Sequence, residues 1–114
     1  MKLPNAERAV VDVEKLRDYS LNPNHPKGKH KARVFLAALG LKADDAERLR
    51  GMIMEAILLS DAKAQQPTIY GQRFVVDFHV TGFDKFVATT VTIRSAWIIR
   101  NGEEFPRLTS CFIL

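Results

Sequence analysis

The fold is decided by the stretch Arg73-Phe74-Val75-Val76-Asp77-Phe78-His79-Val80. Its even positions are apolar, and most of its odd positions are charged or titratable, which is the period-two pattern of a strand that buries one face. Residues 81–85 follow as a hairpin loop, and a run rich in Val, Thr and Ile at 86–99 predicts a long second strand. After a reversal at 100–103, residues 107–114 predict a last strand, so the second half of the chain indicates a small antiparallel sheet.

Two helices are predicted in the first half of the chain. One spans about residues 30–39 and ends at Gly40, because glycine readily adopts the left-handed conformation that terminates helices. The other begins near Asp44, where several acids suit the positive end of a helix and offer a capping box. Its apolar residues recur at helical spacing: Ala46, Leu49, Ile53, Ala56 and Ile57.

The segments around these helices are predicted to be less regular. Residues 9–13 form a short β-rich run, 14–19 a turn of helix, and 21–28 a loop that contains two prolines. Gln65-Gln66-Pro67 is expected to close the helical half. Helices followed by strands predict an α+β fold, with N-terminal helices packed on one face of a small antiparallel sheet formed mainly by the C-terminal half. The 114 residues fit one domain, residues 1–114.

Composition and charge leave the function open. The formal net charge is +4 and the pI about 9.5, which is weak support for a polyanionic partner. Residues 24–33 carry two histidines, four Lys or Arg residues and no acid. Cys111 is the only cysteine and lies in an apolar run, so we expect a buried, inert thiol and no internal disulfide. Since no apolar signal or membrane-spanning run is visible, a cytoplasmic protein without a membrane partner is expected.

One face of the predicted sheet is expected to be open to solvent, because the helices cover the other. Leu108, Ser110, Phe112 and Leu114 are assigned to one side of the last strand, and Cys111 to the other. Arginine and threonine suit phosphate oxygens, but a polar outer face is also ordinary for an antiparallel sheet, so both interpretations stand. The side chains predicted on the open face are Arg73, Asp77, His79, Thr90, Thr92, Arg94, Arg107 and Thr109.

Several chemistries lack their sequence signals. The six glycines are scattered, so no glycine-rich loop is available to cradle a nucleotide phosphate. The three histidines have no clustered acids at metal-binding spacing, and a Gly-x-Ser-x-Gly elbow is missing. The sequence therefore predicts neither a cofactor nor a metal site.

Six motifs together resemble an uncharacterised bacterial domain family. This family occurs as short stand-alone proteins and as the C-terminal tip of large polymorphic toxins. The order of the motifs is specific for the family, whereas no single motif names a chemistry. The motifs extend over nearly the whole chain: Leu3-Pro4-Asn5-Ala6, Gly28-Lys29-His30-Lys31-Ala32-Arg33-Val34-Phe35, Ala38-Leu39-Gly40, Tyr70-Gly71-Gln72-Arg73-Phe74-Val75-Val76-Asp77, Ser95-Ala96-Trp97-Ile98-Ile99 and Pro106-Arg107-Leu108-Thr109-Ser110.

The resemblance implies a toxin-like effector that acts on RNA. Toxin tips of this size are commonly nucleases, and the order of helices and sheet is similar to that of barnase-like, EndoU-like and RelE-like ribonucleases. The implied reaction is metal-independent RNA cleavage, in which a 2′-hydroxyl attacks the neighbouring phosphate. Such a site needs a general acid, a general base and fixed cations that stabilise the phosphorane.

The candidate site residues lie mainly on the matching motifs. His30 would act as acid or base, because imidazole changes its charge near neutral pH. Lys31 would neutralise phosphate, Tyr70 would orient a hydroxyl or stack on a base, and Arg73 would hold a phosphate. The predicted substrate-binding residues are Arg94, Arg107, Thr109, Ser110 and His79. Each also has a structural explanation: His30 and Lys31 suit a solvated helix start, Tyr70 the start of a strand, and Arg107 the cap of a turn.

Other functions stay open beside a ribonuclease. A non-catalytic module would bind RNA or a small partner of the antitoxin or immunity type. A protein-interaction domain would use the strand that ends at Leu114 as an exposed edge for pairing. The expected partners are thus RNA or a small protein, and the sequence does not determine the oligomeric state.

Overall fold

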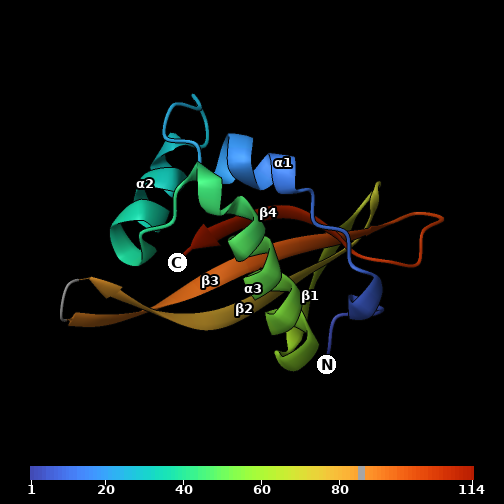
Figure 1. Ribbon diagram of the computed structural model, residues 1–114. Coiled ribbons are helices and arrows are strands. Elements are labelled where there is room, and N and C mark those ends of the chain that lie inside the picture. Colours follow the sequence, from blue (N-terminus) through green and yellow to red (C-terminus); the bar gives the residue numbers. More distant parts are fainter. Residues whose placement is uncertain (85–86) are drawn as a thin grey trace.

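Four antiparallel strands form one sheet in the order β1-β2-β3-β4 (Figure 1). In this computed structural model, the backbone is described for residues 1–84 and 87–114, and the side chains for residues 1–82 and 90–114. The strands are β1 (Ala62–Thr68), β2 (Gly71–Asp84), β3 (Val87–Arg100) and β4 (Arg107–Ile113). β2 continues through most of the predicted hairpin loop to Asp84, while Lys85 and Phe86 lie outside the described residues.

β1 was not expected from the sequence. The prediction that Gln65-Gln66-Pro67 closes the helical half was wrong, because these residues belong to a strand that pairs with β2 from Ala62 opposite Val76 to Thr68 opposite Gly71. Only Ala62 of this strand is buried, so its sequence shows no alternation of apolar and polar residues. Its backbone pairing with β2 makes it a strand.

Two longer helices and four short helical turns make up the first half of the chain. The helix α2 (Lys29–Leu39) ends at Gly40, whose φ of 68° confirms the predicted stop. The helix α3 (Ala46–Leu59) follows the 3-10 turn η3 (Ala43–Asp45), and the Asp45 carboxylate accepts a hydrogen bond from the Lys42 N–H at 2.9 Å. This contact replaces the capping box expected at Asp44. The other turns are η1 (Ala6–Arg8), α1 (Val13–Lys15) and the π-helical η2 (Leu16–Ser20).

The β-rich run at residues 9–13 is not a strand. Only Val10 pairs with the sheet, in an isolated parallel bridge to Arg107 at the start of β4. The Val10 N–H donates to the Pro106 carbonyl at 2.9 Å, and the Leu108 N–H donates to the Val10 carbonyl at 3.0 Å. The helix α1 begins within this run, at Val13, because the Asp12 side chain caps the N–H of Glu14.

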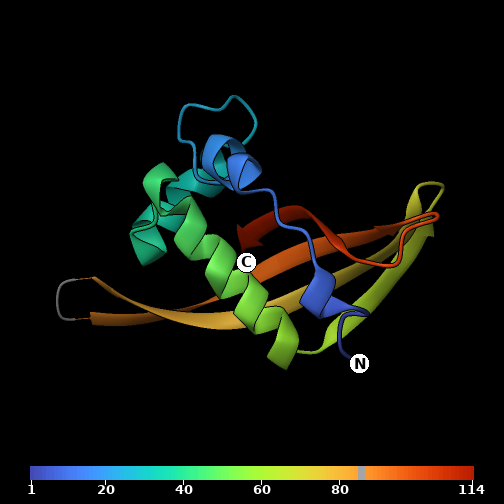
Figure 2. The same ribbon diagram turned by 45° about the vertical axis from the view of Figure 1, so that its right-hand side comes forward.

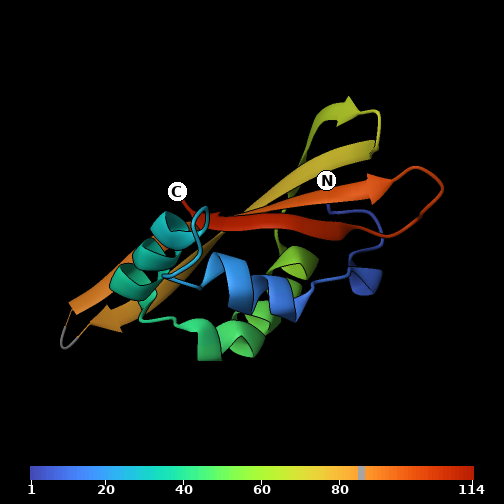
Figure 3. The same ribbon diagram turned by 90° about the horizontal axis from the view of Figure 1, so that it is seen from above.

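The hydrophobic core lies between the helices and one face of the sheet, and Figure 3 shows α1 and α3 on the same side of the strands. The Ser95 hydroxyl ties this face together, since it donates to the Val76 carbonyl at 2.8 Å and accepts from the indole N–H of Trp97 at 2.9 Å. The predicted α+β class is therefore confirmed, and the sheet has one covered face. Core side chains from the helices and the sheet include Phe35, Leu49, Ile53, Ile57, Phe74, Val76, Phe78, Ile93 and Trp97.

A bulge in β4 changes the faces predicted for the last strand. Ala96 pairs with Ser110 and Trp97 with Leu108, so Thr109 is an extra residue in β4. Leu108 therefore faces the core, but Ser110 and Phe112 lie on the open face, contrary to the prediction. Cys111 lies on the covered face, where it is 1% exposed, and burial raises the pKa of its thiol to about 12. The expectation of a buried thiol is confirmed.

Candidate nucleic-acid interface

The open face of the sheet gathers most of the predicted site residues in cross-strand rows. Residues directly opposite each other on antiparallel strands point to the same face. One row consists of Asp77, Arg94 and Phe112, and the next of His79 and Thr92. A third row, nearer the β1–β2 turn, consists of Gln65, Arg73, Ile98 and Arg107. The regular alternation of β2 and β3 thus brings charged residues from distant motifs together.

Asp77 and Arg94 form the central ion pair of the open face. Nε and Nη2 of Arg94 each donate to a carboxylate oxygen of Asp77 at 2.8 Å. The hydrogen bonds from Arg94 lower the pKa of Asp77, and the positive charge of Lys63 on β1 acts in the same direction. Asp77 is therefore ionised at neutral pH and does not suit the role of a general acid. It fixes the guanidinium plane of Arg94, which leaves the Nη1 side for a phosphate oxygen.

His79 lies beside this ion pair on β2. Its Nδ1 is 2.9 Å from the hydroxyl of Thr92, and the direction of this hydrogen bond depends on the imidazole tautomer. The contact fixes the orientation of an otherwise exposed ring and leaves Nε2 available to a ligand. Farther along the same strands, the hydroxyls of Thr81 and Thr90 are 2.9 Å apart. His79 is thus an oriented, accessible imidazole next to a fixed guanidinium.

Lys31 reaches the same row from α2. Its ammonium lies 4.9 Å from the centroid of the Phe112 ring and 5.9 Å from that of Tyr19. Phe112 is directly opposite Arg94, so the row continues from Asp77 through Arg94 and Phe112 to Lys31 at the edge of the sheet. The face of an aromatic ring attracts a cation and positions it without neutralising its charge. Lys31 therefore keeps its charge available to an anion.

The loop before α2 is held in place by hydrogen bonds and an aromatic contact. Nδ1 of His25 accepts hydrogen bonds from the N–H groups of Lys27 and Gly28, both at 3.0 Å, and its ring packs edge-on against Tyr19. A Cβ at Gly28 would collide with the Tyr19 carbonyl, so only glycine allows this approach. The proline-rich loop is therefore an ordered support for α2.

Tyr70 and Arg73 lie toward the other end of the open face. Tyr70 is 70% exposed at the turn between β1 and β2, and its turn is held by Asn101. The Asn101 side chain donates to the Ile69 carbonyl at 2.7 Å, and its N–H donates to the Tyr70 carbonyl at 3.0 Å. Gly71 has a φ of 154°, and the Ile99 carbonyl occupies the place where a Cβ would lie. Tyr70 is thus presented on a defined turn, and Arg73 follows on β2 as an exposed side chain.

The predicted binding residues of β4 differ in whether their side chains are available to a ligand. Arg107 donates through Nε and Nη2 to the Glu103 carboxylate at 2.9 and 2.8 Å, and these bonds lower the pKa of Glu103. The hydroxyl of Thr109 donates to the Ala96 carbonyl at 3.1 Å, which closes the bulge. Ser110 lies opposite Ala96 on the open face. Of the three, Arg107 and Ser110 suit ligand contacts, whereas Thr109 has a structural contact.

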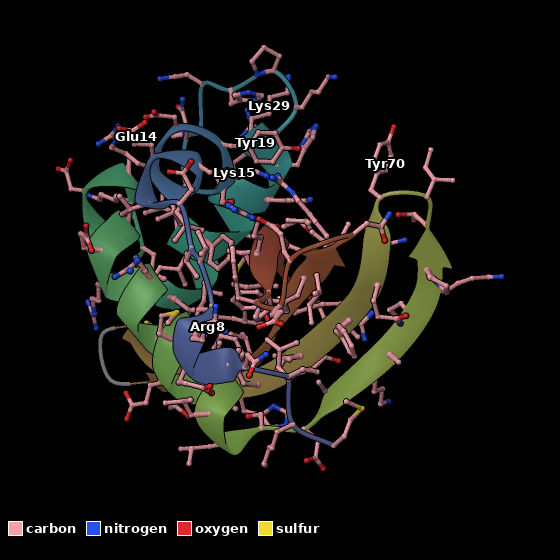
Figure 4. All side chains as sticks on the ribbon, turned by 90° about the vertical axis from the view of Figure 1, so that its right-hand side faces the viewer. Arg8, Glu14, Lys15, Tyr19, Lys29 and Tyr70 are labelled. Carbon is pink, nitrogen blue, oxygen red and sulfur yellow. The ribbon has the colours of Figure 1, made fainter. Side chains whose placement is uncertain are left out.

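His30 does not join the other predicted catalytic residues. It lies exposed near the start of α2, whereas Tyr70 lies on the β1–β2 turn, which Figure 1 shows at the other end of the sheet from α2. Figure 4 labels Tyr70 and Lys29, the neighbour of His30. Among the described side chains, residues 1–82 and 90–114, none forms a hydrogen bond or ion pair with the imidazole of His30. The predicted grouping of His30 with Tyr70 and Arg73 is therefore not assembled in this structure. His79, predicted only as a binding residue, is the histidine that the fold places beside the arginines.

Two residues of this face were missed in the sequence. Lys63 lies opposite Val75, and it was overlooked because no strand was predicted at residues 62–68. Phe112 was assigned to the wrong face because the bulge at Thr109 was not recognised. Together with the residues described above, the open face and its edge carry five positive side chains: Lys31, Lys63, Arg73, Arg94 and Arg107. Two carboxylates, Asp77 and Glu103, offset part of this charge and leave an excess of three positive charges. The open face is therefore basic.

Metal-binding clusters and membrane-spanning helices are both absent from the residues that the structure describes. Among those residues, no group of three or more His, Cys, Asp or Glu side chains is placed to hold a metal ion. None of their helices is both long and apolar enough to cross a membrane.

The fold and this surface define a small α+β protein with a basic, solvent-facing sheet that carries an oriented histidine. The chain belongs to the family described as a domain of unknown function, DUF6883, whose match covers residues 2–114. The predicted membership of an uncharacterised domain family is thereby confirmed. No curated protein and no solved structure was found to match the chain.

Proposed function

We propose that this protein is a small toxin-like effector that binds RNA on the open face of its sheet and cleaves it without a metal ion. The observation that carries the proposal is the position of His79, oriented by Thr92 and next to the Asp77–Arg94 pair on a basic face. An imidazole supplies proton transfer near neutral pH, and a fixed guanidinium supplies charge stabilisation. Both belong to the reaction that the sequence resemblance implies.

The open face suits a single strand of RNA. From Arg73 to His79 the strand β2 extends about 20 Å, enough for several nucleotides, and its odd-numbered side chains all point to this face. Lys63, Arg73 and Arg94 are available to phosphates there. Phe112 and the presented Tyr70 offer ring faces on which unpaired bases can stack. Positive charge interleaved with aromatic rings is typical of single-strand binding.

His79 and Arg94 have distinct roles in the proposed reaction. The 2′-oxygen forms a bond to phosphorus, and the bond between phosphorus and the 5′-oxygen breaks. One proton leaves the 2′-hydroxyl and another reaches the 5′-oxygen, so the step needs a base and an acid. Nε2 of His79 carries one of these transfers, while Arg94, held by Asp77, stabilises the negative charge of the phosphorane.

The test is incubation of the purified protein with a single-stranded RNA in EDTA, read on a denaturing gel. We expect discrete cleavage that His79→Ala and Arg94→Gln abolish. His30→Ala is the matched control, since this histidine is exposed and lies off the open face, and it should cleave like the wild type. Intact RNA at enzyme excess, or cleavage that survives His79→Ala, would contradict the catalytic role.

Binding is measured separately with a non-cleavable, 2′-deoxy substrate. Arg73→Gln and Tyr70→Ala should weaken binding, and the affinity should fall as salt rises, because phosphate contacts release counterions. Affinity that is independent of salt would argue against the basic face as the binding surface.

A non-catalytic protein-interaction module is the second candidate function. The observation that favours it is the β1–β2 turn, where Ile69 and Tyr70 are both exposed on a backbone held by Asn101. Rigid apolar anchors of this kind are typical of interface hot spots. This alternative predicts neither cleavage nor salt-dependent RNA binding, and Tyr70→Ser would weaken a complex with a co-expressed small partner of the immunity type.

A further inference from the structure

The outer edge of β2 is free over half its length. β1 pairs with β2 only as far as Ala62 opposite Val76. From Asp77 onward, no strand within residues 1–84 and 87–114 covers this edge, and Figures 1 and 2 show β2 as the border of the sheet there. Backbone groups at such an edge are a template for pairing with another extended chain.

Hydrogen bonds on the far side of β3 show which backbone groups of β2 are unpaired. The Leu114 N–H donates to the Thr92 carbonyl at 2.9 Å, so Thr92 directs its backbone groups toward β4. Backbone groups alternate in direction along a strand, and His79 is opposite Thr92, so His79 directs its N–H and C=O away from β3. The same holds for Asp77 and Thr81. Their donors and acceptors therefore point to the free edge.

This free edge lacks the features that protect β1. β1 carries Lys63 and Pro67, and its pairing with β2 shifts register between Gln65 and Thr68, all of which discourage further strand addition. Residues 77–82 of β2 contain neither lysine nor proline, and the one acid, Asp77, is bound to Arg94. The unprotected edge is thus suited to pairing.

An apolar groove runs beside the same edge. It has a volume of about 580 Å³ and lies between the second half of α3 and β2. Leu59 at the end of α3 lines it and is 73% exposed, and the neighbouring Leu58 is 53% exposed. The apolar part of its lining is Met52, Ala56, Leu59, Phe78 and Val80. An occupant of this edge would therefore meet both backbone hydrogen-bonding groups and an apolar surface.

We propose that a second copy of this chain occupies the edge, with the two β2 strands paired antiparallel about a two-fold axis near Val80. An antiparallel edge is complementary to itself, because the rotation brings the donors of each copy to the acceptors of the other. The same rotation brings the two grooves and the exposed leucines of α3 next to each other. A nucleic acid lacks the alternating N–H donors and C=O acceptors that would pair with the backbone groups of Asp77, His79 and Thr81. The result is one continuous sheet of eight strands.

The dimer also completes the reactive surface, a step that rests on the proposed function. With the axis at Val80, Thr81 of each copy lies opposite His79 of the other, and the two His79 residues are diagonal neighbours about 7–8 Å apart. Within the described residues, a single copy brings only this histidine to the open face. RNA cleavage needs a base for the 2′-hydroxyl and an acid for the 5′-oxygen, and the two His79 side chains supply one each. No net proton is gained or lost.

The dimer is tested by sedimentation equilibrium of the purified full chain across a concentration series. The wild type should approach twice the monomer mass. Thr81→Pro removes one outward N–H without removing a bond to β3, and it should sediment as a monomer. Thr81→Val is the matched control, since it also loses the hydroxyl contact to Thr90 but keeps the N–H, and it should remain a dimer.

Two outcomes overturn the dimer: a wild type that stays monomeric at the highest concentration, or a Thr81→Pro chain that associates as strongly as Thr81→Val. Circular dichroism establishes that Thr81→Pro is folded. Leu59→Glu, an exposed position on the groove, gives a second variant that should be monomeric without altering any strand. A Leu59→Glu dimer as strong as the wild type would also contradict the proposed interface.

Activity separates the dimer from the proposed function. If the two His79 residues act together, specific activity rises with protein concentration in step with the dimer fraction, and Thr81→Pro loses activity while Thr81→Val keeps it. Specific activity that stays constant while the dimer dissociates would overturn the shared site and leave cleavage by one copy intact. A dimer that never cleaves RNA would overturn the proposed function and leave the edge pairing intact.

Discussion

The two faces of β2 and β3 are made by alternate residues of the same strands, yet they have opposite character. On the covered face, Ser95 and Trp97 are buried in a closed hydrogen-bonded arrangement with the backbone of Val76. On the open face, Arg94 and His79 are held by single side chains and stay accessible. Stability and ligand chemistry therefore depend on alternate residues along one strand. Substitutions at neighbouring positions should therefore have unrelated effects.

The largest effect on stability is expected from Trp97→Ala. Trp97 is one of the largest fully buried side chains, and its removal leaves a cavity and removes the hydrogen bond that the Ser95 hydroxyl accepts. The free energy of unfolding should fall by about 3–5 kcal/mol. Urea unfolding followed by circular dichroism measures this change, because the substitution removes the only tryptophan. A loss below about 1 kcal/mol would contradict the assignment of Trp97 to the core.

A smaller loss is expected from Ser95→Ala on the same face. The substitution leaves the indole N–H of Trp97 without its acceptor in a buried site, and unpaired buried polar groups cost about 1–3 kcal/mol. Unfolding in urea gives the value. Ser110→Ala is the control on the open face and should change stability little, so equal losses for the two serines would remove the distinction between the faces.

The ion pair of the open face should influence stability only weakly, and only above acid pH. The pKa of Asp77 is lowered by hydrogen bonds from Arg94, so the pair stabilises the fold at pH values above the unfolded pKa of aspartate, about 3.9. This stabilisation disappears as the pH falls through the lower folded pKa. In Arg94→Gln, the carboxyl resonance of Asp77 should therefore titrate at higher pH in an NMR titration. An unchanged titration would show that Arg94 does not hold Asp77 in solution.

The smallest effect is expected from His79→Ala. The imidazole is exposed and makes one hydrogen bond to Thr92, so the midpoint of urea unfolding should stay close to that of the wild type. RNA cleavage should be lost all the same. Loss of activity together with a large loss of stability would place His79 in the fold rather than in the site.

The sequence was sufficient for features that depend on local patterns. Alternation in residues 73–80 predicted which side chains of β2 face the core, and Gly40 predicted the end of α2. The open-face positions of Arg73, Asp77, His79 and Arg94 follow from the same period of two. These predictions hold because the backbone geometry of a strand or helix determines which of its residues share a face.

Features that depend on pairing between distant segments could not be predicted. β1 has almost no buried side chains, so its sequence contains no strand pattern to detect. The bulge at Thr109 exists because β4 pairs with β3 in two registers, and it moves Ser110 and Phe112 to the open face. The distance between His30 and Tyr70 could not be predicted for a similar reason, since sequence motifs do not state which end of the sheet each element occupies.

By itself, the sequence determined an α+β chain with a two-faced sheet and a basic character. Hydrophobic periodicity and helix-stop residues act over a few positions, so these features are present in any local window of the chain. The position of His79, and not His30, beside Arg94 depends on tertiary packing, as does the edge of β2 that β1 leaves open from Asp77. Both depend on the register and length of pairing between strands, and these are set by the packing of the whole domain.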